Sequence, residues 1–353
     1  MNFAGVVINP GDYHFKGNTT INAESDNYAG LAFSSSAPRT NITFSDGNFV
    51  IDAKNDSTAF NSIGGISIDN WVGTQAKIII TTLNGTLNIS GQARNRGGIT
   101  GVAYGSGYHG YVFKGDGDVN VKGVSDSSNG VDMRFFDNTG VTGNFTITGE
   151  SNTGNGVAVP KFGEISLVNA TITGSSQSGA GILMNASDKQ IKKIDLNGNT
   201  LTGTSVSGAG IKINGNNVSI ANGSLNGTSQ GNGAGVELTG GNNYTVSHAT
   251  VTGQSAGGNA VGVNGNLTLN DSTLSGNTAN GSGVSVNGNV NATNTTISGG
   301  ATGSGNGVSL GGNASITDGT VTGSTVDGNG VSVSGNVNTT NTTVTGDATG
   351  SGT

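Results

Sequence analysis

Short stretches of alternating apolar and polar residues recur along the chain at a nearly constant interval. The segment "GNGVSLGGNASITDGTVTG" (305–323) is followed by "GNGVSVSGNVNTTNTTVTG" (328–346). In the first copy Val308 and Leu310 alternate with Ser309, so two apolar side chains point to one face of an extended strand and a small polar one to the other. The pattern predicts strands of three to five residues separated by turns.

Two apolar positions mark every repeat. The first follows a Gly-rich turn and is occupied by Val131, Val157, Ile182, Ile211, Val236, Val261, Val284, Val308 and Val331. The second lies in the motif T-[VIL]-[TS]-G or a close variant and is occupied by Ile147, Ile172, Leu201, Leu225, Val251, Leu274, Ile297, Val321 and Val344. A third extended piece, such as "NLTLN" (266–270), lies between them. Each repeat is therefore expected to contain three strands.

Strands this short need to stack on their own copies to bury a core. We therefore expect an all-β fold, a right-handed parallel β-helix with about 23–25 residues per coil and longer, irregular loops in the first part. Inward Val, Ile and Leu would form continuous ladders, and Asn and Thr would stack on their copies. Leucine-rich repeats would need a Leu-rich consensus with a helical half, calcium-binding β-rolls need G-G-x-G-x-D, and propeller blades are longer than these repeats.

Composition divides the chain into two parts. Of its 18 aromatic residues, 16 precede residue 150, as do all four Arg. We expect residues 1–150 to form an irregular, aromatic-rich β-helical part that serves recognition. Residues 151–353 would form a regular β-helix that is truncated at its C-terminal end, because the final "ATGSGT" repeats the opening of "ATGSGNGV".

Charge and cysteine content limit the classes of partner. The chain has 14 Lys and Arg against 21 Asp and Glu, which argues against nucleic acid as a partner because such binding requires clustered cations. It contains no Cys, so disulfides cannot stabilise it. No apolar run approaches the roughly 20 residues that a membrane-spanning helix needs.

Catalytic and metal-binding patterns are weak. Asp116 and Asp118 in "KGDGDVNVKG" could form a carboxylate pair, but a turn between coils also requires Gly and Asp. His14, His109 and His248 are isolated in the sequence and lack metal-ligand spacing. We therefore expect no enzyme, no metal and no small-molecule cofactor.

The most distinctive stretch is "ARNRGGITGVAYGSGYHGYVFKGDGD" (93–118). Tyr and Arg dominate the energetics of protein interfaces, and Gly-rich loops let them adapt to a partner. Alternatively, its aromatic residues could fill a widened coil. The candidate receptor-binding residues are Trp71, Arg94, Arg96, Tyr104, Tyr108, His109 and Tyr111.

The repeats "GNGVSLGGNASITDGTVTGST" and "GSGVSVNGNVNATNTTISGG", which contain no Cys, resemble the exoproteins of Gram-negative two-partner secretion. That group comprises filamentous-haemagglutinin-type adhesins and the contact-dependent growth inhibition proteins called CdiA, and the repeats are most similar to the central, receptor-binding part of CdiA. The similarity covers roughly residues 120–353. The chain has N-P-G in "VVINPGDYHF" where the secretion domain of the family has N-P-N-x motifs, and it shows no toxin-like domain.

The resemblance implies a secreted protein on the surface of a Gram-negative bacterium. Its partner would be an outer-membrane protein or lipopolysaccharide of a neighbouring target bacterium, and the chain would be a monomeric fragment of a filament. We therefore expect a non-enzymatic binding module for contact-dependent inhibition or adhesion. The alternatives are the structural stalk of an adhesin and a polysaccharide-active β-helix enzyme.

Overall fold

A computed structural model describes residues 4–34, 39–58, 64–69, 77–100, 110–133, 135–159, 164–185, 193–195 and 198–350. These residues contain strands, turns and bends and no helix. The strands form a right-handed parallel β-helix with about 26 residues per coil, which confirms the fold expected from the repeats. Chain contacts divide it into unit 1 (Met1–Ser176) and unit 2 (Gln177–Thr353).

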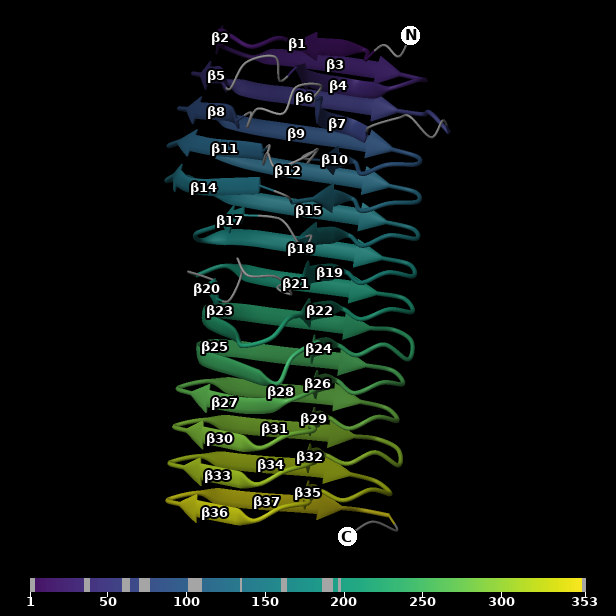
Figure 1. The fold of residues 1–353 in the computed structure, drawn as a ribbon, viewed down its shortest axis with the longest axis vertical. Coiled ribbons are helices and arrows are strands. Elements are labelled where there is room, and N and C mark those ends of the chain that lie inside the picture. The colour runs from purple at the N-terminus through teal and green to yellow at the C-terminus, as the bar shows by residue number, and fades with distance from the viewer. Residues whose placement is uncertain are drawn as a thin grey trace. The chain divides into compact units, whose positions relative to one another are not determined.

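Each complete coil of unit 1 contributes one strand to each of three sheets, and Figure 1 shows the strands of each sheet stacked over one another. The first sheet contains β1 (Val6–Ile8), β4 (Ala29–Ser34), β7 (Gly64–Asp69), β10 (Ile99–Thr100), β13 (Val131–Asp132) and β16 (Val157–Val159). The second contains β2 (Asp12–Lys16), β5 (Arg39–Ser45), β8 (Lys77–Leu83), β11 (Gly110–Gly115), β14 (Phe135–Val141) and β17 (Glu164–Ser166). The third contains β3 (Thr19–Ser25), β6 (Asn48–Asn55), β9 (Thr86–Ala93), β12 (Asp118–Ser125), β15 (Phe145–Ser151) and β18 (Ala170–Ser176).

Unit 2 repeats the three-strand coil in a shorter form. Its first strands are β19 (Ile182–Asn185), β22 (Ile211–Asn214), β24 (Val236–Thr239), β26 (Val261–Val263), β29 (Val284–Val286), β32 (Val308–Leu310) and β35 (Val331–Val333). Its middle strands are β20 (Lys193–Asp195), β27 (Asn266–Asn270), β30 (Val290–Thr293), β33 (Ala314–Thr317) and β36 (Val337–Thr340). Its third strands are β21 (Thr200–Ser205), β28 (Thr273–Thr278), β31 (Thr296–Ala301), β34 (Thr320–Thr325) and β37 (Thr343–Ala348), while β23 (Val218–Ser229) and β25 (Asn243–Ser255) run through both middle and third positions.

The register confirms the two apolar ladders. Val261 pairs with Val284, which pairs with Val308. The second ladder likewise places Leu274 between Val251 and Ile297. Because each residue pairs with its copy one coil away, the side chains of one kind stack about every 4.8 Å along the axis of the unit.

The glycine of T-x-T-G faces the interior rather than a corner. A Cβ on Gly299 would lie 1.9 Å from the carbonyl oxygen of Gly307, in the turn that leads into the next coil. No side chain fits in that space, so the motif requires glycine for close packing. The positive φ values at the corners are carried mostly by Asn and Asp, as at Asn294 and Asp318.

Buried hydroxyls hold the Gly-rich turns at the end of several third strands. Ser255 Oγ donates to the carbonyl of Gly233 (2.7 Å) and accepts from the amide of Gly258 (2.9 Å). Thr278 repeats this arrangement one coil further on. These bonds satisfy backbone groups that no strand pairs, and so they hold the turns in place.

Candidate binding site

Arg94 and Arg96 lie in the turn between β9 and β10 of unit 1, and both are exposed. Their backbone is held by the coil that follows. Ser125 Oγ donates to the carbonyl of Arg96 (2.7 Å), and Ser127 Oγ donates to the carbonyl of Arg94 (2.8 Å). The two guanidinium-bearing residues therefore project from a turn whose backbone is fixed.

The turns of neighbouring coils stack on this one. The amide of Arg94 donates to the carbonyl of Asn55 (3.2 Å), and the amide of Asp126 donates to that of Ala93 (3.1 Å). Asp56, Arg94 and Asp126 therefore occupy equivalent places in successive coils. We call these turns, residues 56–58, 94–97 and 126–129, the turn column. Asp126 Oδ1 also accepts from Asn152 Nδ2 at 3.1 Å.

The turn column carries both signs of charge. Lys54 Nζ lies 2.5 Å from the carboxylate of Asp56 and 3.7 Å from that of Glu24. The hydrogen bond and the negative charge of Asp56 raise the pKa of Lys54, and Glu24 adds to this effect. Arg94 lies between the two acidic positions of the column, so a partner would meet alternating charges.

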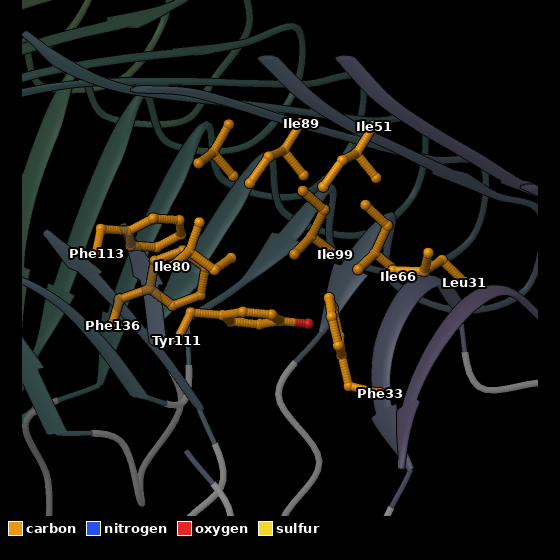
Figure 2. A pocket seen from close by; sticks show the side chains of 11 residues that line it. Leu31, Phe33, Ile51, Ile66, Ile80, Ile89, Ile99, Tyr111, Phe113 and Phe136 are labelled. Carbon is orange, nitrogen blue, oxygen red and sulfur yellow. The ribbon is translucent and has the colours of Figure 1, made fainter. Parts of the chain in front are cut away.

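Tyr111 is placed differently from the expected surface position. Its side chain is 3% exposed and lies inside the tube, where its ring centroid is 5.3 Å from that of Phe136 and 6.1 Å from that of Phe33. Figure 2 shows it among the labelled apolar residues. Burial raises the pKa of Tyr111, whose hydroxyl donates to the carbonyl of Thr100 (3.3 Å). A partner at the surface cannot reach this side chain, so Tyr111 acts in packing.

Four other candidates lie outside the described residues. These are Trp71, Tyr104, Tyr108 and His109. The described part of the site is therefore the turn column with Arg94 and Arg96. Asp56 and Asp126 were not predicted as part of this site, although both follow the end of a third strand at the same offset as Arg94.

The two carboxylates considered for catalysis hold turns of adjacent coils. Asp116 Oδ1 accepts from the amide of Asn84 (3.0 Å). Asp118 Oδ1 accepts from the amide (2.8 Å) and the side chain (3.1 Å) of Asn144. Each carboxylate thus bonds to a different coil, one before and one after. Both carboxylates therefore stabilise turns between coils.

No group of three or more His, Asp or Glu that could hold a metal ion occurs among the described residues. His14 is exposed on β2, and His248 is paired with Asp271 at 3.4 Å in unit 2. We identify no residue set for a cofactor in the described ranges.

The architecture defines the protein as a parallel β-helix with a charged turn column on one of its two units. No family model, no curated protein and no solved structure matches the chain. Among the described residues, no helix is long and apolar enough to cross a membrane.

Proposed function

We propose that the chain is a non-enzymatic binding module of a secreted, cell-surface exoprotein of a Gram-negative bacterium. Unit 1 recognises an outer-membrane protein or lipopolysaccharide of a neighbouring cell for contact-dependent inhibition or adhesion. The single observation that carries the proposal is the turn column, where Arg94 and Arg96 project from an ordered backbone between acidic neighbours.

The interior below the turn column supports this role. The side chains of Tyr111, Phe113 and Phe136 pack together with aliphatic neighbours and leave a cavity of only about 10 Å³. A cavity of that size holds at most one water molecule. A closely packed scaffold keeps exposed side chains in position, which lowers the conformational entropy that binding would otherwise cost.

The resemblance of the repeats to two-partner secretion exoproteins supplies the cellular context. Proteins of that group present β-helices at the cell surface, and in CdiA-like members a mid-chain region recognises the target cell. The choice between an outer-membrane protein and lipopolysaccharide rests on experiment, because Arg binds carboxylate and phosphate groups alike.

The test is binding of the fluorescently labelled protein to Gram-negative cells. Changing Arg94 and Arg96 together to Ala is expected to weaken binding by roughly 10- to 30-fold, the effect of losing an interface hot spot. The control changes Arg39 and Lys77 to Ala, which removes two exposed cations from the second sheet of the same unit. Equal binding by both variants would contradict the role of the turn column.

Two further experiments distinguish an outer-membrane protein from lipopolysaccharide as the receptor. Protease treatment of the target cells abolishes binding if the receptor is an outer-membrane protein. Cells with truncated lipopolysaccharide lose binding if the receptor is the glycolipid. If the intact protein binds no cells at all, the stalk alternative replaces the proposal.

A further inference from the structure

Unit 2 has a polar groove that the proposed receptor contact does not use. The groove is shallow and open to solvent, and it extends over four coils at the corner between the middle and third strands. Two columns of side chains border it, each built from residues in register. We call this feature the corner groove.

The outer column consists of residues with positive φ. Asp271, Asn294, Asp318 and Asn341 have φ values of 47°, 50°, 51° and 47°. Asn and Asp tolerate this left-handed conformation better than other residues with a side chain. Asn294 Nδ2 donates to Asp271 Oδ1 (2.7 Å), and Asn341 Nδ2 donates to Asp318 Oδ1 (3.1 Å). The column is thus ordered. Asp271 Oδ2 lies 3.4 Å from His248 Nε2, whereas Asp318 Oδ2 has no partner among the described residues and offers an acceptor site.

The opposite column is a row of threonines. Thr273 pairs with Thr296, and the register continues through Thr320 to Thr343. Their hydroxyls have no hydrogen-bond partner among the residues that the structure describes. Each hydroxyl can therefore both donate to and accept from a ligand.

The hydroxyl groups at the floor of the corner groove already donate hydrogen bonds within the protein. Ser272 Oγ donates to the carbonyl of Asn270 (2.6 Å), and Thr295 Oγ1 donates to that of Thr293 (2.8 Å). Both side chains are buried. The floor therefore forms a fixed base, and the binding capacity lies in the two columns above it.

These groups favour one kind of ligand. None of the described residues that line the groove is aromatic, basic or a large apolar residue, so an apolar peptide would find no pocket for its side chains. Asp271 and Asp318 repel anions, which disfavours phosphorylated or uronic-acid chains. Hydroxyl groups of a ligand can donate to the carboxylates and exchange hydrogen bonds with the threonines. A chain of sugars provides such groups at regular intervals.

We propose that the corner groove binds a neutral or amino-bearing glycan chain that lies along the axis of unit 2. Successive coils repeat about every 4.8 Å, so equivalent groups recur along the chain and weak contacts add up through multivalency. Asp318, which keeps one carboxylate oxygen without a described partner, is the position where an ammonium group of the glycan would form its strongest contact. This site is separate from the turn column and goes beyond the proposed function.

The experiment uses the whole protein on an array of neutral, amino-bearing and acidic oligosaccharides. Neutral and amino-bearing chains are expected to bind, and acidic chains are not. Absence of binding to any glycan, or a preference for acidic ones, would overturn the proposal. Changing Thr296 and Thr320 together to Val keeps β-branched side chains but removes two hydroxyls, and about tenfold weaker binding is expected.

Two further variants sharpen the result. Changing Ser285 and Ser309 to Ala removes two half-buried hydroxyls on the outward side of the first sheet of unit 2, and glycan binding should persist. Asp318→Asn should reduce binding of amino-bearing chains about tenfold while neutral chains bind as before, because Asn already occupies this corner at Asn294. If Asp318→Asn leaves the amino-bearing chains unaffected, the assigned role of that carboxylate is wrong.

The variant with Arg94 and Arg96 changed to Ala separates the two proposals. It should bind glycans normally even where its cell binding is lost. Cell binding that depends on Thr296 and Thr320 but not on the two arginines would instead overturn the proposed function and leave the groove proposal standing. Unfolding midpoints equal to that of the unchanged protein confirm that each variant is folded.

Discussion

The two units build the same three-strand coil with different amounts of chain. In unit 1, Ile51 pairs with Ile89 and Ile89 with Val121, so successive copies are 38 and 32 residues apart. In unit 2, Leu274 pairs with Ile297, only 23 residues further on. The longer coils have a broad second sheet and an aromatic interior. The shorter coils enclose mainly Val, Leu, Ile and Ala.

The difference teaches which positions a coil must keep and which it can change. Inward columns are constrained in both units because each side chain packs on its copy. Outward columns vary: the third sheet of unit 1 carries Asp52, Lys122 and Glu150, whereas that of unit 2 presents mostly hydroxyl and amide side chains. Binding properties can therefore differ between units that share one backbone plan.

The largest expected effect tests the aromatic interior of unit 1. Phe113 is 1% exposed and lies 5.0 Å from Phe145 and 5.9 Å from Phe136, centroid to centroid. Phe113→Ala should lower the free energy of unfolding by about 3–5 kcal/mol because it leaves a large cavity. Urea unfolding followed by circular dichroism measures the change.

The matched change in unit 2 is Leu269→Ala. Its register partner in the next coil is Ala292, so this interior already accommodates alanine at that place. We expect a loss near the lower end of the 2–5 kcal/mol range, about 2 kcal/mol. A loss larger than that of Phe113→Ala would contradict the view that unit 1 depends more strongly on its large side chains.

The second prediction concerns the inward glycine of unit 2. Gly299→Ala would place a Cβ 1.9 Å from the carbonyl oxygen of Gly307, so the backbone must shift. Overpacking should lower the free energy of unfolding by about 1–3 kcal/mol, which urea unfolding measures as a lower midpoint. Gly262→Ala serves as the control because its Cβ would meet only the side chain of Asn259 at 3.7 Å. Equal losses would contradict close packing as the cause, because Gly→Ala lowers the entropy of the unfolded chain and by itself would stabilise the protein.

Comparison with unit 1 explains why the glycine is not universal. Ala23 and Ala53 occupy the same position in the first long coils, in register with Gly91. Both alanines are buried, so these coils leave room for a methyl group where the coils of unit 2 do not.

The third prediction tests the buried hydroxyl of Ser255, which holds the Gly-rich turn after β25. Ser255→Ala leaves the carbonyl of Gly233 and the amide of Gly258 without their side-chain partner, which should cost about 1–3 kcal/mol. Ser255→Thr should be nearly neutral, because Thr278 makes the same bonds in the next coil. A similar loss for both variants in urea unfolding would refute the assignment.

One coil of unit 1 uses a larger side chain, Asn55, for the same task. Asn55 is 1% exposed, donates from Nδ2 to the carbonyl of Tyr28 (2.5 Å) and accepts from the amide of Ser57 (2.9 Å). Side chains thus hold turns in both units, since Ser125 and Ser151 of unit 1 make the same kind of bonds as Ser255.

The sequence was sufficient to predict the ladders, because apolar residues at fixed offsets can stack only if the strands repeat in register. Val284, Val308 and Val331 do so. The role of the T-x-T-G glycine was not predictable, since close approach of Gly307 to Gly299 depends on how the turn folds back inside the tube. The periodicity of the sequence predicts the spacing between equivalent residues but not which groups pack against one another inside the β-helix.

The candidate site was predicted less completely, for a physical reason. Exposed Arg94 and Arg96 follow from a Gly-rich, charged stretch, whereas Tyr111 in the same stretch is buried. A tyrosine packs equally well inside a widened coil or against a partner, so composition does not distinguish these positions. The distinction depends on whether the residue falls on the inward or outward side of β11.

The smallest expected effect concerns the surface charges that distinguish the units. Lys122 Nζ lies 2.8 Å from Glu150 Oε1, and both side chains are about half exposed. Exposed ion pairs contribute little because water screens them and ordering two long side chains costs entropy. Glu150→Gln introduces the amide that unit 2 has at Gln254, so we expect a loss of at most about 1 kcal/mol in low salt. Urea unfolding in 1 M NaCl should reduce the difference to near zero, because the Debye length falls to about 3 Å. A loss that exceeds about 2 kcal/mol or persists in high salt would mean that the charges of unit 1 stabilise its fold, and they would then not be free to vary with the partner.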